Sequence, residues 1–134
     1  MAKVTLRVGS EPRQFIGDAD GYQVVVDRGE VGKPRSIELF LLGLGTCTIS
    51  TVDHFLRRKD LPTEDLTVEV TSELDKVTNT YGNIRLNLHI SDKIPEEMRR
   101  VVQGVAKTCR IHKTIASAPE IEIEVSAEHE RSAA

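Results

Sequence analysis

The chain is built around one apolar run that carries two glycines and a cysteine, Leu39-Phe40-Leu41-Leu42-Gly43-Leu44-Gly45-Thr46-Cys47-Thr48-Ile49. Ser36 precedes the run with a hydroxyl that can cap a helix, and Pro62 lies beyond its end. These signals predict a helix from about Ile37 to Arg58. Because the run is apolar on nearly every side, we expect burial all round, with the glycines allowing another backbone to approach closely.

Segments on both sides of this helix alternate polar and apolar residues, which is the pattern of half-buried strands. Strands are predicted at residues 3–8, 14–16, 22–27, 65–74, 84–90 and 120–127. A second helix is predicted to open near Pro95 and to carry Cys109 near its end, because the apolar residues between them follow helical spacing. This order predicts an α+β fold with a largely antiparallel sheet, and residues 1–134, without repeat or linker, are expected to form a single domain.

Composition argues against several classes of function. The net charge of -3, from 18 basic and 21 acidic side chains, gives no strong field for nucleic acid or for an anionic membrane. The strongly apolar stretch from Leu39 to Val52 is shorter than the about 20 residues that cross a bilayer, and the alternating N-terminus lacks the pattern of a signal peptide. We therefore expect a cytoplasmic protein. With 39% apolar and 4% aromatic residues, the core of one chain is modest, which favours burial against a second copy.

The chain has only two cysteines, Cys47 and Cys109, which lie far apart in the sequence. In a reducing compartment a disulfide between them would be transient and catalytic rather than structural. A buried cysteine is also often just a small core residue, so this reading stays open for both. A further hypothesis is that both cysteines bind zinc together with His54 and His112 in a Cys₂His₂ site, although the spacing of these residues is not that of a zinc knuckle.

Two segments resemble the two cysteine motifs of the OsmC/Ohr family, namely Ser36-Ile37-Glu38-Leu39-Phe40-Leu41-Leu42-Gly43-Leu44-Gly45-Thr46-Cys47 and Ala106-Lys107-Thr108-Cys109-Arg110-Ile111-His112-Lys113-Thr114-Ile115. The resemblance covers nearly the whole chain, because the order of the elements also fits. It implies an OsmC-like fold of antiparallel sheets around central helices in an intertwined homodimer. It also implies a stress-response peroxidase that reduces organic hydroperoxides, with Cys47 as the peroxidatic residue and Cys109 as the resolving residue.

The implied reaction uses no bound cofactor or metal, only an external dithiol reductant. A thiolate cleaves the peroxide and becomes a sulfenic acid, which condenses with a second thiol to a disulfide that the dithiol then reduces. Burial alone would raise the pKa of a thiol, so we expect a cation beside Cys47. The apolar neighbours Leu42, Leu44 and Ile49 favour an alkyl or fatty-acyl hydroperoxide over hydrogen peroxide.

Characterised members of the Ohr branch activate the thiol with an N-terminal arginine and a glutamate ten residues before the first cysteine. Here Ile37 occupies the glutamate position and Glu38 follows it. One residue turns a helical side chain by about 100°. Glu38 and Arg13 are nevertheless the candidates for this pair, with Arg28 and Arg35 as rivals for the cation.

The sequence leaves a second class of function open. A fold does not establish an activity, so a noncatalytic OsmC-like dimer that binds a small apolar ligand is the alternative. His112, three residues after Cys109, is the one histidine that could pair with a thiol as a base, although no third group to orient it is evident.

Overall fold

The fold is α+β, as the sequence predicts, and both of its sheets are antiparallel. The computed structural model describes residues 1–27 and 31–127, so the candidate Arg28 lies outside the described residues. The elements follow in the order β1 (Thr5–Val8), β2 (Gln14–Ala19), β3 (Tyr22–Asp27), α1 (Ser36–Arg58), β4 (Thr67–Asp75), β5 (Thr80–His89), α2 (Glu96–Ala106) and α3 (Arg110–Ala116).

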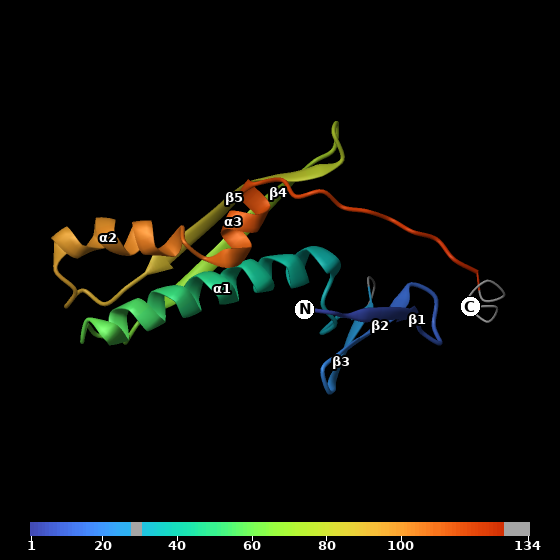
Figure 1. The fold of residues 1–134 in the computed structure, drawn as a ribbon, viewed down its shortest axis with the longest axis horizontal. Helices are drawn as coiled ribbons and strands as arrows, with labels where there is room; N and C mark the ends of the chain where they lie inside the picture. The colour runs from blue at the N-terminus through green and yellow to red at the C-terminus, as the bar shows by residue number, and fades with distance from the viewer. Residues whose placement is uncertain (28–30, 128–134) are drawn as a thin grey trace.

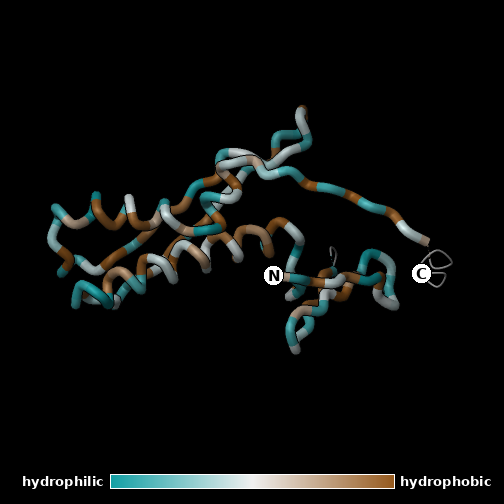
Figure 2. Tube along the Cα trace, in the orientation of Figure 1, coloured by the Kyte–Doolittle hydropathy of each residue, from teal (hydrophilic) through white to brown (hydrophobic). Residues whose placement is uncertain are grey.

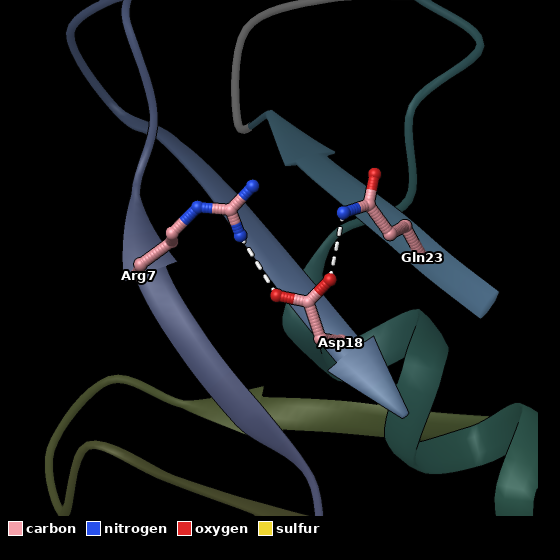
Figure 3. A network of polar contacts seen from close by, with 3 residues as sticks. All are labelled: Arg7, Asp18 and Gln23. Atoms are coloured by element: carbon pink, nitrogen blue, oxygen red, sulfur yellow. Dashed lines mark hydrogen bonds and ion pairs between the residues drawn. The ribbon is translucent and has the colours of Figure 1, made fainter. Parts of the chain in front are cut away.

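The three N-terminal strands form a small meander that stands beside the start of α1 (Figure 1). Asp18 on the middle strand accepts hydrogen bonds from Arg7 at 2.7 Å and from Gln23 at 2.7 Å, which ties the three strands together across one face (Figure 3). The tight turn after β2 uses Gly21 at φ 87°, a conformation that costs glycine little. Val8 is 75% exposed, so one chain does not supply a cover for this sheet.

The remaining elements pack around α1, which contacts β4, α2 and α3. Four fully buried side chains form the core, Val52, Leu56, Ile94 and Val102. Gly45 is where β4 comes close, because a Cβ atom there would lie 3.0 Å from Val70 Cγ2. The predicted close approach therefore exists at Gly45, against a side chain rather than a backbone, whereas Gly43 has no such neighbour within 4 Å.

The expectation that α1 is buried all round is wrong for a single chain. The helix buries one side, including Leu44 and Leu56, whereas Phe40 is 43% exposed and Leu42 is 61% exposed. By length and hydropathy alone, α1 would also suffice to cross a membrane, but its contacts with a sheet and two helices are those of a core helix. Among the residues that the structure describes in one chain, no element buries the side of α1 that carries Phe40 and Leu42.

The structure has two helices where the sequence predicts one continuous second helix. Helix α2 ends at Ala106, and Cys109 is the N-cap residue of a separate helix, α3. The hydroxyl of Thr108 donates a 2.7 Å hydrogen bond to the carbonyl of Val105, so a side chain satisfies a carbonyl at the helix end. The apolar spacing continues through this break, which is why periodicity alone does not reveal it.

The predicted strand at residues 120–127 is also not formed in one chain. The segment has no regular secondary structure, and its three apolar side chains are exposed, namely Ile121, Ile123 and Val125 at 85%, 85% and 91%. Figure 2 shows hydrophobic and hydrophilic residues alternating along this segment as it leaves the body of the molecule. The strand pattern is present, but a strand needs a partner that this chain does not offer.

Candidate active site

The contact between α1 and α3 brings together the two cysteines that the sequence separates. Cys47 lies in the middle of α1 and is partly exposed, whereas Cys109 precedes α3 and is 1% exposed. Both are free thiols, and the Cys47 side chain is one of the groups that lower the pKa of Cys109. The packing of α1 against α3 therefore brings a partly exposed thiol into the surroundings of a buried one.

The sulfur of Cys109 collects several hydrogen-bond donors. The backbone N–H of His112 lies 3.5 Å from Cys109 Sγ, and the N–H of Ile111 also points to it. Burial raises the pKa of the Cys109 thiol, but these hydrogen bonds outweigh the burial. Those from Cys47 and the His112 amide contribute most, and that from the Thr48 hydroxyl contributes next. The net result is a lowered pKa, which favours the thiolate of Cys109.

Thr48 is a part of this site that sequence reasoning missed. Its side chain is 2% exposed, and its hydroxyl donates a 2.9 Å hydrogen bond to the carbonyl of Leu44. The same hydroxyl also lies in hydrogen-bonding contact with Cys109 Sγ. The sequence signal for this residue is a threonine that follows the first cysteine and lies beside the apolar stripe of the helix. Only the position of α3 shows which group the hydroxyl contacts.

A cavity of about 1060 Å³ is lined by Thr48, which follows Cys47, and by His112, which lies three residues after Cys109, but by neither cysteine itself. Its inner wall is apolar, with Leu86 and Leu88 from β5 and Val102 from α2. Its polar rim comes from α2, namely Glu96, Glu97, Arg99, Arg100, Gln103 and Lys107. The cavity is large enough for a small organic molecule and is lined as ligand sites usually are.

Two of the predicted activating residues lie elsewhere in the single chain. Arg13 is exposed in the turn between β1 and β2, where its φ is 64°. Glu38 accepts hydrogen bonds from the backbone N–H of Arg35 at 2.9 Å and from its guanidinium at 3.3 Å. Within residues 1–27 and 31–127, no hydrogen bond or ion pair joins either arginine to Cys47.

The Glu38 carboxylate caps the start of α1. The backbone hydrogen bond from Arg35 lowers the pKa of Glu38 most, followed by the bond from the Arg35 side chain and its charge. A carboxyl group whose pKa is depressed on folding contributes stability above its unfolded pKa and loses that contribution as the pH falls through its folded pKa.

We therefore expect a Glu38→Gln variant to melt below the wild type at neutral pH, with the gap closing in acid. The glutamine can still accept the Arg35 amide, so the difference reports the charge. Thermal unfolding of both proteins across an acidic to neutral series checks this. A gap that stays constant down to strongly acidic pH would contradict the charge-based cap.

The histidines do not form a metal cluster with the cysteines. His54 is exposed on α1, two turns after Cys47, while His112 lies beside Cys109. Among the residues that the structure describes, no group of three or more His, Cys, Asp or Glu side chains is arranged to hold a metal ion. The site thus consists of two thiols, a hydroxyl and backbone amides.

Comparison with known proteins agrees with this architecture. The OsmC-like protein family matches residues 29–124. An OsmC-like protein from Mycoplasma pneumoniae has a TM-score of 0.70 at 18% identity, covering 94% of this chain and 96% of that one. The organic hydroperoxide resistance protein OhrB of Bacillus subtilis has a TM-score of 0.61 at 18% identity, covering 85% of this chain and 89% of that one.

A third solved structure is described as an organic hydroperoxide resistance protein OsmC from Legionella pneumophila, with a TM-score of 0.62 at 19% identity and coverage of 86% of this chain and 88% of that one. No curated protein sequence matches significantly. At these identities the solved structures establish the shared fold, and the family match covers most of the chain. The chain therefore belongs to the OsmC-like protein family.

Proposed function

We propose that this protein is a thiol-dependent peroxidase that reduces organic hydroperoxides. Cys47 is the thiol that attacks the peroxide, and Cys109 is the thiol that resolves the product. A dithiol supplied from outside restores both thiols, without a bound cofactor or metal. The protein works in the cytoplasm, without nucleic acid or membrane as a partner.

The observation that supports this proposal is the packing of α1 against α3, through which the side chain of Cys47 becomes one of the groups that lower the pKa of Cys109. A disulfide needs its two sulfurs to meet, and this packing brings together the elements that carry two residues distant in sequence. Partial exposure of Cys47 lets a peroxide reach it, whereas buried Cys109 is shielded from solvent and positioned to attack Cys47 next.

The reaction follows the chemistry of thiols. The Cys47 thiolate attacks one peroxide oxygen, the O–O bond breaks, and the products are a Cys47 sulfenic acid and an alcohol. The Cys109 thiolate then attacks the sulfur of the sulfenic acid and expels hydroxide, which becomes water. The favoured thiolate of Cys109 suits it to this second step.

The cavity beside the site suits an organic substrate. Its apolar wall of Leu86, Leu88 and Val102 favours an alkyl group, while Thr48 and His112 belong to the two segments that carry the cysteines. Glu38 stays outside this proposal because it is engaged with Arg35, and Arg13 stays outside because no described interaction links it to a sulfur.

A homodimer is part of the proposal, and the exposed area of one chain supports it. One chain exposes 10949 Å², whereas a compact protein of 14.9 kDa exposes about 7000 Å². The excess on one chain is larger than the area that each partner of a typical obligate dimer buries. The uncovered features are the open side of α1, the N-terminal sheet and the segment at residues 120–127.

The same cavity is also the observation that supports the alternative, a noncatalytic dimer that binds a small apolar ligand. The two functions differ in whether they require the thiols of Cys47 and Cys109. A ligand carrier should bind its ligand equally well without these thiols, whereas a peroxidase without them should not consume peroxide.

Consumption of peroxide in the presence of a dithiol tests the proposal. We expect the reduced protein to consume cumene hydroperoxide faster than hydrogen peroxide, because apolar surroundings hold the cumyl group and do not help the smaller peroxide. Peroxide remaining over time is measured for both substrates with the same protein and dithiol. Failure to consume either peroxide above the dithiol background would reject the activity and leave the ligand carrier.

A further inference from the structure

The proposed disulfide between Cys47 and Cys109 presents an external reductant with two sulfurs of very different accessibility. Cys47 is partly exposed, whereas Cys109 is 1% exposed. A thiolate opens a disulfide by attacking one sulfur while the other sulfur leaves, so access and leaving-group strength decide which sulfur is attacked. The surroundings of each cysteine therefore determine how the disulfide is opened.

Cys109 is held in the interior by its own backbone. Its N–H donates a 3.4 Å hydrogen bond to the carbonyl of Ala106, and its carbonyl accepts a 3.0 Å hydrogen bond from the N–H of Lys113. These bonds tie it to the end of α2 and to the first turn of α3. A backbone movement that carries its sulfur to the surface would break both. Contact with a second copy can remove exposed area from Cys109 but cannot add to it, so a reductant has little access to this sulfur.

Cys47 lies on a part of α1 that leaves space beside its side chain. The side chain of a helical residue leans over the preceding turn, which for Cys47 is the turn that carries Gly43. Gly43 is exposed, and a Cβ atom there would meet no other element of the described chain within 4 Å. Ser50, one turn after Cys47, is also exposed. The small residues on both sides of Cys47 therefore leave its sulfur open to a thiol from outside.

Cys109 is also suited to be the leaving group. The backbone N–H of His112 lies 3.5 Å from Cys109 Sγ and donates to it, so negative charge on this sulfur is stabilised as it forms. Burial raises the pKa of the Cys109 thiol, but hydrogen bonds, with the Cys47 side chain and the His112 amide foremost, bring that pKa below its ordinary value. A thiol with a lower pKa leaves a disulfide faster.

We propose that the external dithiol attacks the sulfur of Cys47 and that Cys109 leaves as a thiolate, so the covalent intermediate with the reductant forms at Cys47. Cys47 then receives both reagents, the peroxide and the dithiol, through one opening beside Gly43. The inference rests on the proposed peroxidase function, and it adds which sulfur the reductant attacks.

The steps balance in electrons and protons. One sulfur of the dithiol attacks Cys47 as a thiolate, which forms the mixed disulfide, breaks the bond between Cys47 and Cys109 and leaves the electron pair on Cys109. The second sulfur of the dithiol then attacks the first as a thiolate, closes the oxidised dithiol and expels the Cys47 thiolate. Two electrons pass from the dithiol to the protein, and the two protons that the dithiol loses return to Cys47 and Cys109.

The decisive experiment locates the covalent intermediate. The internal disulfide is formed with diamide in place of a peroxide and is exposed briefly to 2-mercaptoethanol, whose single thiol cannot close into a ring. After an acid quench, the protein is unfolded, alkylated and mapped by mass spectrometry. We expect at least about tenfold more adduct on Cys47 than on Cys109. Because 2-mercaptoethanol is small enough to give buried Cys109 its best chance, equal adducts on the two cysteines, or more on Cys109, would overturn the inference.

A side chain placed beside Cys47 tests the route of approach. Gly43→Leu puts a branched side chain on the turn over which Cys47 leans, and we expect it to slow the opening of the disulfide by 2-mercaptoethanol at least about fivefold. The matched control is Gly104→Leu, which makes the same change at an exposed glycine of α2 whose Cβ would also meet nothing within 4 Å in the described chain. This control should open at the wild-type rate. Equal rates for Gly43→Leu and the wild type would overturn the approach beside Gly43.

The outcomes separate this inference from the proposed function. An adduct on Cys47 in a protein that consumes no peroxide would support the order of reduction and overturn the peroxidase. An adduct on Cys109 in a protein that does consume peroxide would overturn the order of reduction alone. Failure of diamide to form the internal disulfide would overturn both, because both require the two sulfurs to bond.

Discussion

Replacing Cys47 with serine is expected to reduce the turnover of cumene hydroperoxide to the uncatalysed background, a loss of at least about a thousandfold. The serine hydroxyl does not ionise near neutral pH, so it cannot attack the O–O bond as a thiolate does. The variant should fold, because the side chain is only partly buried and the change is small. Steady-state peroxide consumption with excess dithiol measures the effect.

Replacing Cys109 with serine should stop turnover at a later step, after the oxidation of Cys47. Cys47 is still oxidised, and its sulfenic acid then lacks a resolving thiol. Dimedone should therefore label Cys47 in Cys109→Ser and leave the resting wild type unlabelled after reaction. Turnover of Cys47→Ser at the wild-type rate would contradict the assignment. Thr114→Val serves as the control for substitution as such, because it changes an exposed residue of α3 whose hydroxyl donates a 2.8 Å hydrogen bond to the carbonyl of Arg110.

The second large effect concerns the segment at residues 120–127. We expect Ile121→Ser with Ile123→Ser to weaken the homodimer strongly, because both side chains are 85% exposed in one chain and would be buried between two. Because both protomers carry the change, the dimer loses four buried isoleucines, which costs about 8 kcal/mol and corresponds to about a millionfold in the dissociation constant. Sedimentation equilibrium of the wild type should give twice the 14.9 kDa of one chain.

The matched control changes the alternate side chains of the same segment. Glu122→Gln with Glu124→Gln keeps the apolar positions, so this variant should remain dimeric. A wild type that sediments as a 14.9 kDa species at micromolar concentration would contradict the dimer itself. Equal dissociation of both double variants would contradict the role of the isoleucines.

Elements whose signals are local could be predicted closely from the sequence. The apolar run around Cys47 predicts α1 from about Ile37 to Arg58, and the structure has it at Ser36–Arg58. The alternation at residues 22–27 predicts β3, which spans Tyr22–Asp27. The turn at Gly21 fixes the start of β3, whereas α1 begins one residue earlier than predicted because Arg35, not Ser36, is its N-cap residue.

Features that depend on other parts of the chain could not be predicted in this way. The break before Cys109 carries neither glycine nor proline and keeps the helical spacing, so only the packing of α3 on α1 reveals it. The position of Thr48 against Cys109 follows from that packing. The alternation at residues 120–127 predicts a strand, but this segment forms no strand within the part of one chain that the structure describes.

Counting thiols before and after one equivalent of cumene hydroperoxide tests the redox pair most directly. If Cys47 and Cys109 work together, both thiols of the reduced protein disappear for each peroxide, the mass falls by two hydrogens, and a dithiol restores both. Loss of neither thiol, or of one thiol with a gain of oxygen in place of an internal disulfide, would contradict the pair as a peroxidase centre.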